Sequence, residues 1–141
     1  MTREIQVESE QAMLELGTEL ASEFCPGTIV LLSGNLGAGK TTLVRGVLSG
    51  LGYNQPVRSP TYNLLQVFDT HPPVLHVDLY RVESAEGLGI EDYMESHICL
   101  IEWPDRWAEI AGHPRAIHIQ IDFIDAGRKV TVNGPARPVQ S

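Results

Sequence analysis

A glycine-rich segment that ends in lysine and threonine constrains this chain more than any other feature. Residues 34–41 read Gly-Asn-Leu-Gly-Ala-Gly-Lys-Thr, which has the Gly-x-x-x-x-Gly-Lys-Thr spacing of a phosphate-binding loop. The segment follows an apolar run, Thr28 to Leu32, and precedes a helical pattern that extends to Leu51. A buried strand, a glycine loop and a helix in this order predict an α/β fold with a phosphate site where the strand ends.

Each part of this loop has its own role at a bound phosphate. Gly34 and Gly39 let the backbone approach closely, because a side chain would prevent the contact. Lys40 is predicted to reach the β- and γ-phosphate oxygens, and the Thr41 hydroxyl to bind Mg²⁺. ATP is the expected substrate and ADP the expected product. The nucleotide-binding residues predicted here are Asn35, Leu36, Gly37, Ala38, Gly39, Lys40, Thr41 and Thr42.

Two acidic residues end apolar strands and are candidates for the metal side of the site. Asp78 follows Val74 to Val77, and Glu102 follows Ile98 to Ile101. Strand carboxyl ends line the ligand crevice of an open α/β sheet, and Mg²⁺ prefers oxygen ligands. We therefore predict Thr41, Asp78 and Glu102 as metal ligands and Lys40, Asp78 and Glu102 as catalytic. Glu102 could bind the metal or orient the attacking water, and a solvated strand-end acid remains the alternative for each carboxylate.

Three further residues near these strands each allow two interpretations. Thr61, in the segment Ser59-Pro60-Thr61-Tyr62, could sense the γ-phosphate as a catalytic switch residue or belong to an ordinary turn. Trp103 could stack on a nucleotide base or cap the core. His76, two residues before Asp78, is predicted to be packed or hydrogen-bonded rather than a metal ligand.

The apolar pattern elsewhere predicts a single domain over residues 1–133 and a flexible tail over 134–141. The expected fold is a three-layer P-loop NTPase-like sandwich, with a mostly parallel central sheet and an antiparallel C-terminal hairpin. Ser9 is the predicted N-cap of the first helix. Strands are predicted over 2–7, 28–32, 62–68, 74–79, 98–101, 116–124 and 129–132, helices over 10–24, 41–51 and 104–110, and short helical pieces over 84–94.

Composition narrows the classes of partner. The chain carries 18 acidic and 10 basic residues, a formal net charge of −8, and no run of Lys or Arg. Unaided binding to a nucleic acid is therefore not expected, and neither is a role on DNA. No apolar run reaches the roughly 20 residues of a membrane span, and the first residues lack a signal-peptide layout, so a cytoplasmic location is expected. Cys25 and Cys99 are predicted to be reduced core residues.

Missing motifs separate this chain from other P-loop families. The Asn-Lys-x-Asp and Asp-x-x-Gly strings of small GTPases do not occur, nor does the Leu-Ser-Gly-Gly-Gln string of transporter ATPases. A small-molecule kinase acting on a nucleoside or metabolite remains the main alternative. Its cationic lid would have to come from Arg81, Arg106 and Arg115, which are scattered. A nucleotide-dependent scaffold that does not hydrolyse ATP is a second alternative.

Four segments together resemble one family. Residues 34–42 (Gly-Asn-Leu-Gly-Ala-Gly-Lys-Thr-Thr), 59–62 (Ser-Pro-Thr-Tyr), 76–81 (His-Val-Asp-Leu-Tyr-Arg) and 101–104 (Ile-Glu-Trp-Pro) occur in this order. This combination closely resembles the TsaE (YjeE) family, the ATPase of bacterial tRNA threonylcarbamoyladenosine synthesis. The match extends from about Val7 to Val132.

The resemblance implies a function and a set of partners. It implies that ATP binding and hydrolysis support threonylcarbamoylation of adenosine 37 in tRNAs that read codons starting with A. The transfer chemistry would belong to TsaD and TsaB, through which the chain would act on tRNA indirectly. Slow ATP hydrolysis by the chain alone and activation in the partner complex are expected.

The resemblance also implies residue roles. Thr41 and Glu102 match Mg²⁺ positions, Asp78 matches a position near the metal, and Thr61 lies in the switch-like loop. Glu10 matches an acidic position near the nucleotide. The family often has an acid in place of Asn35 and threonine in place of Met13, so its contacts near the base are not carried over to these two positions.

Overall fold

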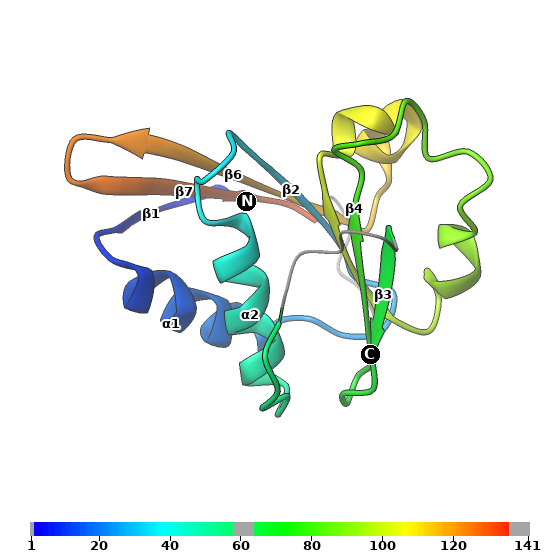
Figure 1. The fold of residues 1–141 in the computed structure, drawn as a ribbon, viewed down its shortest axis with the longest axis horizontal. Coiled ribbons are helices and arrows are strands. Elements are labelled where there is room, and N and C mark those ends of the chain that lie inside the picture. The colour runs from blue at the N-terminus through cyan, green and yellow to red at the C-terminus, as the bar shows by residue number, and fades with distance from the viewer. Residues whose placement is uncertain (1, 58–63, 136–141) are drawn as a thin grey trace.

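The computed structural model describes residues 2–57 and 64–135 of the chain (Figure 1). The 3₁₀ helices are labelled η. The elements are β1 (Thr2–Val7), α1 (Glu10–Ala21), β2 (Ile29–Gly34), α2 (Lys40–Gly50), β3 (Leu65–Phe68), β4 (Val74–Asp78), η1 (Ile90–Tyr93), β5 (Ile98–Glu102), η2 (Pro104–Arg106), η3 (Ala108–Gly112), β6 (Ala116–Ile124) and β7 (Gly127–Asn133). Within the described part of the chain, no helix is long and apolar enough to cross a membrane.

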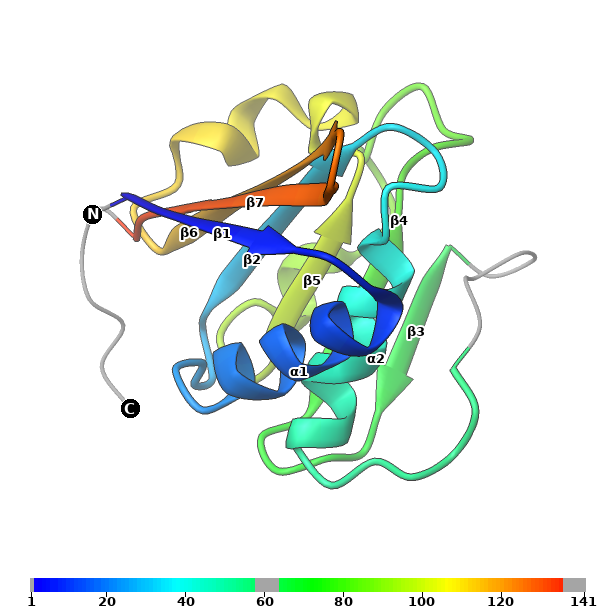
Figure 2. The same ribbon diagram turned by 90° about the vertical axis from the view of Figure 1, so that its left-hand side faces the viewer.

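The seven strands form one mixed sheet in the order β1-β7-β6-β2-β5-β4-β3 (Figure 2). The inner strands β6, β2, β5 and β4 are parallel, and β2 lies between β6 and β5. Antiparallel pairs extend the sheet at both sides, β7 and β1 beyond β6 and β3 beyond β4. The phosphate-loop strand β2 is therefore in the interior of the sheet, where both of its faces are covered.

Both α-helices pack on the same face of the sheet (Figure 1). Ser9 caps α1, since its Oγ accepts a hydrogen bond from the Ala12 amide at 3.0 Å, which confirms the predicted N-cap. Alternate residues of the inner strands, among them Val30 and Leu100, meet buried residues of the helices such as Leu48. These contacts form the larger of the two hydrophobic cores.

The opposite face of the sheet has a different cover. Its core contains Leu31, Val77 and Ile101, with Ile90 of η1 and Ile110 of η3 packed on them. Both covering helices are 3₁₀ turns of four or five residues. The α/β fold is confirmed, but a second α-helical layer is not present among the described residues, so the three-layer arrangement stays unconfirmed.

The sheet is also less parallel than predicted, because antiparallel pairing is not confined to the C-terminal hairpin. The connection from β3 to β4 has only five residues, 69–73, which is too short for the crossover that parallel neighbours need. A second correction concerns the single helix predicted over 104–110: the structure has two short 3₁₀ helices there, η2 (Pro104–Arg106) and η3 (Ala108–Gly112).

Two glycines bring the helices α1 and α2 into backbone contact. A Cβ atom at Gly46 would lie 2.4 Å from the Leu14 carbonyl oxygen, and one at Gly17 would lie 2.8 Å from the Gly46 Cα. Thr18 strengthens the crossing, since its Oγ1 lies 3.0 Å from the Leu14 carbonyl oxygen and 3.2 Å from that of Gly46. The helix that starts at the phosphate loop is therefore held directly against α1.

We expect Gly46→Ala to lower the free energy of unfolding by about 2 kcal/mol, because overpacking costs more than the helix propensity that alanine adds. Chemical denaturation measures this change. Gly112→Ala is the matched control, since nothing lies within 4 Å of a Cβ atom at that position. Equal stability of the two variants would contradict the close crossing.

Candidate functional site

A cleft of about 320 Å³ opens between the phosphate loop and the carboxyl ends of β4 and β5. It lies where the sequence places the phosphate and metal sites. The residues that line it are Leu36, Gly37, Gly39, Lys40, Thr41, Thr42, Asp78, Tyr80, Glu102 and Trp103.

Strand register brings the two predicted carboxylates together. Asp78 and Glu102 are direct partners in the parallel pairing of β4 with β5. Side chains alternate along a strand, so Glu102 shares a face with Leu100, which packs in the core beneath α2. Both carboxylates therefore line the cleft beside the phosphate loop, as predicted.

Glycines give the loop its shape. At Gly34 φ is 154°, and a Cβ atom there would lie 2.7 Å from the Ile121 carbonyl oxygen of β6. Gly39 is the N-cap of α2 with φ of 113°, in the left-handed region, where other residues are strained. The chain can therefore turn directly from β2 into α2 with its amides at the start of a helix, which favours anions.

Lys40 is held at the wall of the cleft. Its Nζ donates a hydrogen bond to the Gly34 carbonyl at 2.6 Å and lies 3.7 Å from the centroid of the Trp103 ring. The pKa of Lys40 is lowered, because its side chain is buried. The negative charges of Glu102, Asp78 and Asp105 act in the opposite direction and offset part of this effect. The ammonium group therefore lies within electrostatic reach of both carboxylates of the cleft.

Trp103 has an unusual backbone conformation. Its φ of 61° is the only positive value among the described residues other than glycine. Such a conformation costs about 1–2 kcal/mol and is found often at functional sites. It turns the chain after Glu102, so that the indole lies over Lys40 and its centroid lies 4.8 Å from that of Tyr80. The ring lines the cleft and also packs on the core.

The two carboxylates have different surroundings. Glu102 is buried, and its Oε2 lies 2.6 Å from Nε2 of His76. Asp78 is half-buried, and its Oδ1 accepts the Tyr80 amide at 3.0 Å. The pKa of Asp78 is raised, mainly by burial and also by the negative charge of Glu102. The hydrogen bond from the Tyr80 amide acts in the opposite direction. The interpretation of His76 as a hydrogen-bonded residue is confirmed.

The side chains of the cleft suit Mg²⁺. Thr41, Asp78 and Glu102 offer a hydroxyl and two carboxylates, the hard oxygen donors that this ion prefers. Across residues 2–57 and 64–135, no three His, Cys, Asp or Glu side chains are grouped to hold a metal ion. Mg²⁺ is commonly bound by one or two carboxylates together with substrate phosphates, and this set of residues fits that mode.

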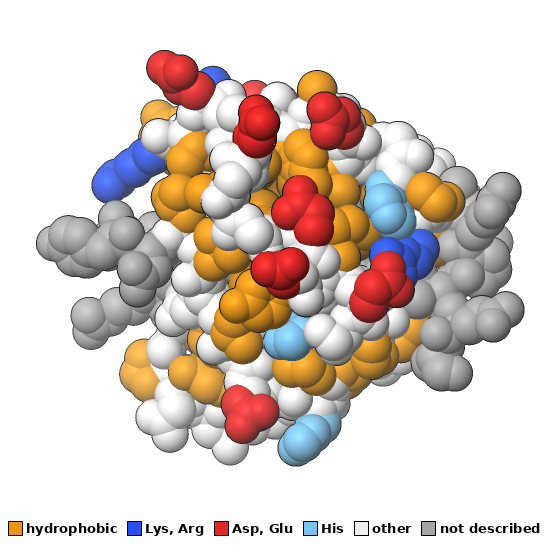
Figure 3. Space-filling view, turned by 90° about the vertical axis from the view of Figure 1, so that its right-hand side faces the viewer, with side chains coloured by type: hydrophobic (Ala, Val, Ile, Leu, Met, Phe, Trp, Pro, Cys, Tyr) orange, Lys and Arg blue, Asp and Glu red, His pale blue; other side chains and the backbone are white. Residues whose placement is uncertain are grey.

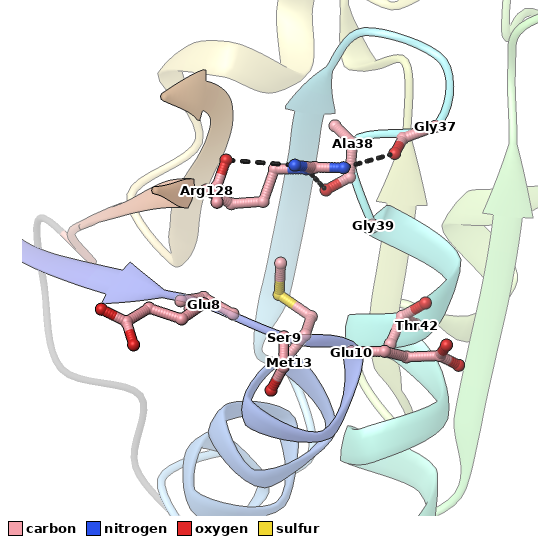
Figure 4. Close-up of a pocket in the computed structure, with 11 residues that line it drawn as sticks. Glu8, Ser9, Glu10, Met13, Gly37, Ala38, Gly39, Thr42 and Arg128 are labelled. Carbon is pink, nitrogen blue, oxygen red and sulfur yellow. Dashed lines mark hydrogen bonds between the residues drawn. The ribbon is translucent and has the colours of Figure 1, made fainter. Parts of the chain in front are cut away.

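A second cleft, of about 380 Å³, lies on the other side of the phosphate loop (Figure 4). Its walls come from the β1–α1 junction, the loop and the start of β7, and Gly37, Gly39 and Thr42 also line the first cleft. Glu10 lines it, and Oε1 of Glu10 lies 2.8 Å from the Arg45 guanidinium. Met13 extends from α1 toward Gly39. A Cβ atom added at Gly39 would lie 3.0 Å from the Cε of Met13.

Arg128 is the residue at this cleft that sequence reasoning missed. Its Nε donates to the Ala38 carbonyl at 3.1 Å and its Nη2 to the Gly37 carbonyl at 3.5 Å (Figure 4). The guanidinium also lies 4.1 Å from the centroid of the Phe123 ring. A lone arginine after a hairpin turn carries no recognisable sequence signal, so only the fold brings it to the loop.

Several other predicted residues lie away from these clefts or outside the described part. Thr61 falls outside the described residues, and its switch role stays a prediction. Asn35 is exposed and lines neither cleft. Neither cleft is lined by Arg81, Arg106 or Arg115, and Arg115 forms an ion pair with Glu95 at 2.9 Å.

Cys99 is fully buried, and burial raises the pKa of its thiol to about 12, so it is not a nucleophile. Among the described residues, neither Cys25 nor Cys99 is part of a disulfide; Cys99 lies in the core as predicted, whereas Cys25 is only half-buried.

Comparison with known proteins gives consistent matches. A family model described as threonylcarbamoyl adenosine biosynthesis protein TsaE matches residues 7–130. The tRNA threonylcarbamoyladenosine biosynthesis protein TsaE of Haemophilus influenzae is 41% identical over 126 residues, covering 85% of this chain and 75% of the relative. The protein of the same name from Streptomyces coelicolor is 37% identical over 134 residues, covering 86% and 90%. The crystal structure of Bacillus subtilis YdiB superposes with a TM-score of 0.80 at 27% identity, covering 94% and 84%.

Proposed function

The chain belongs to the TsaE family of threonylcarbamoyl adenosine biosynthesis proteins, and on this premise we propose that it is a Mg²⁺-dependent ATPase of that tRNA modification. It acts in the cytoplasm with TsaD and TsaB, which carry out threonylcarbamoylation of adenosine 37. The observation that carries the proposal is the convergence of Lys40, Asp78 and Glu102 on one cleft beside the phosphate loop.

The two clefts divide the nucleotide between them. The phosphates lie on the loop, with the γ-phosphate toward Asp78 and Glu102, and the nucleoside extends into the second cleft toward Met13 and Arg128. The shared residues Gly37, Gly39 and Thr42 support this arrangement, because the loop forms a wall of both clefts. Glu10 contacts the nucleotide from the second cleft, at its nucleoside end, and Trp103 contacts it from the first cleft, at its phosphate end.

The residues of the first cleft have separate roles in hydrolysis. Thr41, Asp78 and Glu102 would hold Mg²⁺, which would neutralise the charge that develops on the phosphates. Lys40 exchanges its contact with the Gly34 carbonyl for the phosphate oxygens and stabilises the same charge from the loop side. Glu102 also orients the attacking water, since a fixed carboxylate next to the γ-phosphate can accept a hydrogen bond from that water.

The acidity of the surface supports an indirect role on tRNA. Acidic side chains outnumber basic ones on the face that carries η1 (Figure 3). Phosphate binding requires Lys and Arg to displace counterions, so this face does not favour RNA. Contact with tRNA therefore passes through TsaD and TsaB. The exposed acidic residues around η1 include Glu83, Glu86, Glu91, Asp92 and Glu95.

The small-molecule kinase is the weaker candidate. A kinase needs cationic groups over the γ-phosphate of the donor. The three arginines that could form such a lid do not line the phosphate cleft, whereas the arginine that approaches the loop, Arg128, binds its backbone carbonyls. A phosphorylated product formed from ATP and a panel of nucleosides would nevertheless favour the kinase.

The proposal predicts slow ATP hydrolysis by the purified chain with Mg²⁺ and faster hydrolysis with TsaD and TsaB. The physical reason is that the cleft of the lone chain is open to solvent. Partners that cover it would exclude bulk water and so strengthen the electrostatic interactions inside the cleft. Phosphate release measured with and without the partners tests this, together with multiple-turnover formation of modified adenosine 37 in tRNA. Omission of the chain is the control for the tRNA reaction. Equal ATPase rates with and without partners, or unchanged tRNA modification without the chain, would contradict the proposal.

A further inference from the structure

His76 and Glu102 form a buried pair beneath the phosphate cleft. Their side chains are 0% and 4% exposed, and His76 Nε2 lies 2.6 Å from Glu102 Oε2. In the parallel register His76 is the partner of Leu100. Its side chain therefore reaches forward to Glu102, two positions farther along β5. Glu102 lines the cleft, whereas His76 is behind it and does not.

The hydrogen bonding of the imidazole is one-sided. Among the described residues, Nδ1 of His76 is buried and has no hydrogen-bond partner, so Nε2 makes the only polar contact assigned to the ring. A contact this short between nitrogen and carboxylate oxygen requires a proton between them. With Glu102 as the ionised carboxylate that would bind a metal ion, Nε2 is the donor, because a carboxylate only accepts. Leaving a buried ring nitrogen unpaired is costly, and a purely apolar side chain would avoid this cost.

We propose that His76 is a positioning residue, which fixes the Glu102 carboxylate by donating from Nε2 to Oε2 and so directs Oε1 toward the cleft. The inference rests on the proposed function, since it concerns the binding of a metal–nucleotide complex by Glu102. The glutamate side chain is flexible, and without a partner its carboxylate samples several rotamers. A hydrogen bond from the buried His76 ring holds it in one of them. Partners of this kind commonly change metal affinity or activity by about 10- to 100-fold.

His76→Leu removes the donor and keeps an apolar side chain in the core. We expect it to weaken binding of Mn²⁺, an oxygen-binding substitute for Mg²⁺, to the ADP-loaded protein by about 10-fold or more. Electron paramagnetic resonance measures free Mn²⁺ directly. The kcat for ATP should fall by a similar factor, while the affinity for ADP without metal stays unchanged.

His76→Gln and Ile98→Val separate positioning from stability. Glutamine carries an amide donor at about the reach of Nε2, so this variant should recover most of the Mn²⁺ affinity. Ile98→Val removes a methylene from the same face of β5 and should lower the melting temperature by a few degrees, because it leaves a small gap in the core. It should leave Mn²⁺ affinity unchanged.

A double-mutant cycle identifies the path of the effect. If His76 acts through Glu102, His76→Leu should have little further effect on Mn²⁺ affinity in a Glu102→Gln background. Additive losses would mean that His76 acts elsewhere and would overturn the proposal, as would unchanged Mn²⁺ affinity of His76→Leu.

A measurement on the unaltered protein does not depend on how the variants fold. Long-range ¹H–¹⁵N correlation spectra report which ring nitrogen carries the proton, and we expect protonated Nε2 in His76. An unprotonated Nε2 would overturn the assignment. Failure of the unaltered ADP-loaded protein to bind Mn²⁺ would instead contradict the proposed function, so the two failures are distinguishable.

Discussion

Replacement of Lys40 by alanine is expected to remove measurable ATP hydrolysis, a loss of about 10³-fold or more. Among the described residues, Lys40 is the basic side chain that lines the cleft together with both carboxylates. Without it, charge that develops on the γ-phosphoryl group loses its stabilisation from the loop side. Phosphate release at saturating ATP measures the change.

The chain offers a matched control, because its only other lysine is Lys129 in β7. Lys129→Ala makes the same chemical change, and Lys129 lines neither cleft. It should retain an ATPase rate within about twofold of the unaltered protein. Detectable hydrolysis by Lys40→Ala at more than a tenth of the original rate would remove Lys40 from the catalytic set.

The second large effect is expected at Glu102. Glu102→Gln keeps the shape of the side chain and can still accept the hydrogen bond from His76, but it removes the negative charge. We expect kcat to fall by about 100-fold or more, since both metal binding and orientation of the attacking water need a carboxylate. The affinity for ATP should change far less, because the loop amides and Lys40 remain. Parallel measurements of turnover and of nucleotide binding separate the two.

Glu109→Gln is the control for this charge change. Glu109 is an exposed carboxylate of η3 that lines neither cleft, so its variant should behave as the unaltered protein. A Glu102→Gln protein that hydrolyses ATP at near-normal rate would exclude the carboxylate from the mechanism. Equal losses in kcat and in ATP affinity would instead limit Glu102 to nucleotide binding.

Local sequence pattern was sufficient to predict the glycine loop and the two strand-end acids beside it. Glycine spacing predicts the loop, and the apolar runs before Asp78 and Glu102 predict buried strands that end in acids. Parallel strands place their carboxyl ends at one edge of a sheet, so the convergence of these residues follows from fold class. The register that makes Asp78 and Glu102 direct neighbours agrees with this expectation.

Features that depend on long-range contacts could not be predicted in this way. Arg128 approaches the loop because β6 pairs with β2 and the hairpin then turns back over Ala38. The left-handed backbone of Trp103 is set by the turn out of β5, and nothing in Glu-Trp-Pro indicates it. The mixture of parallel and antiparallel pairs depends on the edge of the sheet at which β1 and β3 lie. The alternation of apolar residues along a strand does not specify its neighbours in the sheet.

The position of β1 has a consequence for how the protein is made. Among the described residues, β1 pairs with β7 alone, so it has no partner until the opposite end of the domain has emerged from the ribosome. The second cleft needs both ends, since Val7 to Glu10 form one wall and Arg128 another. Nascent chains can thus complete the strand and helix around the phosphate loop before the second cleft can form. A chain cut ahead of β7 would keep the loop and lose the pocket beside it, leaving β6 as an exposed sheet edge open to other chains.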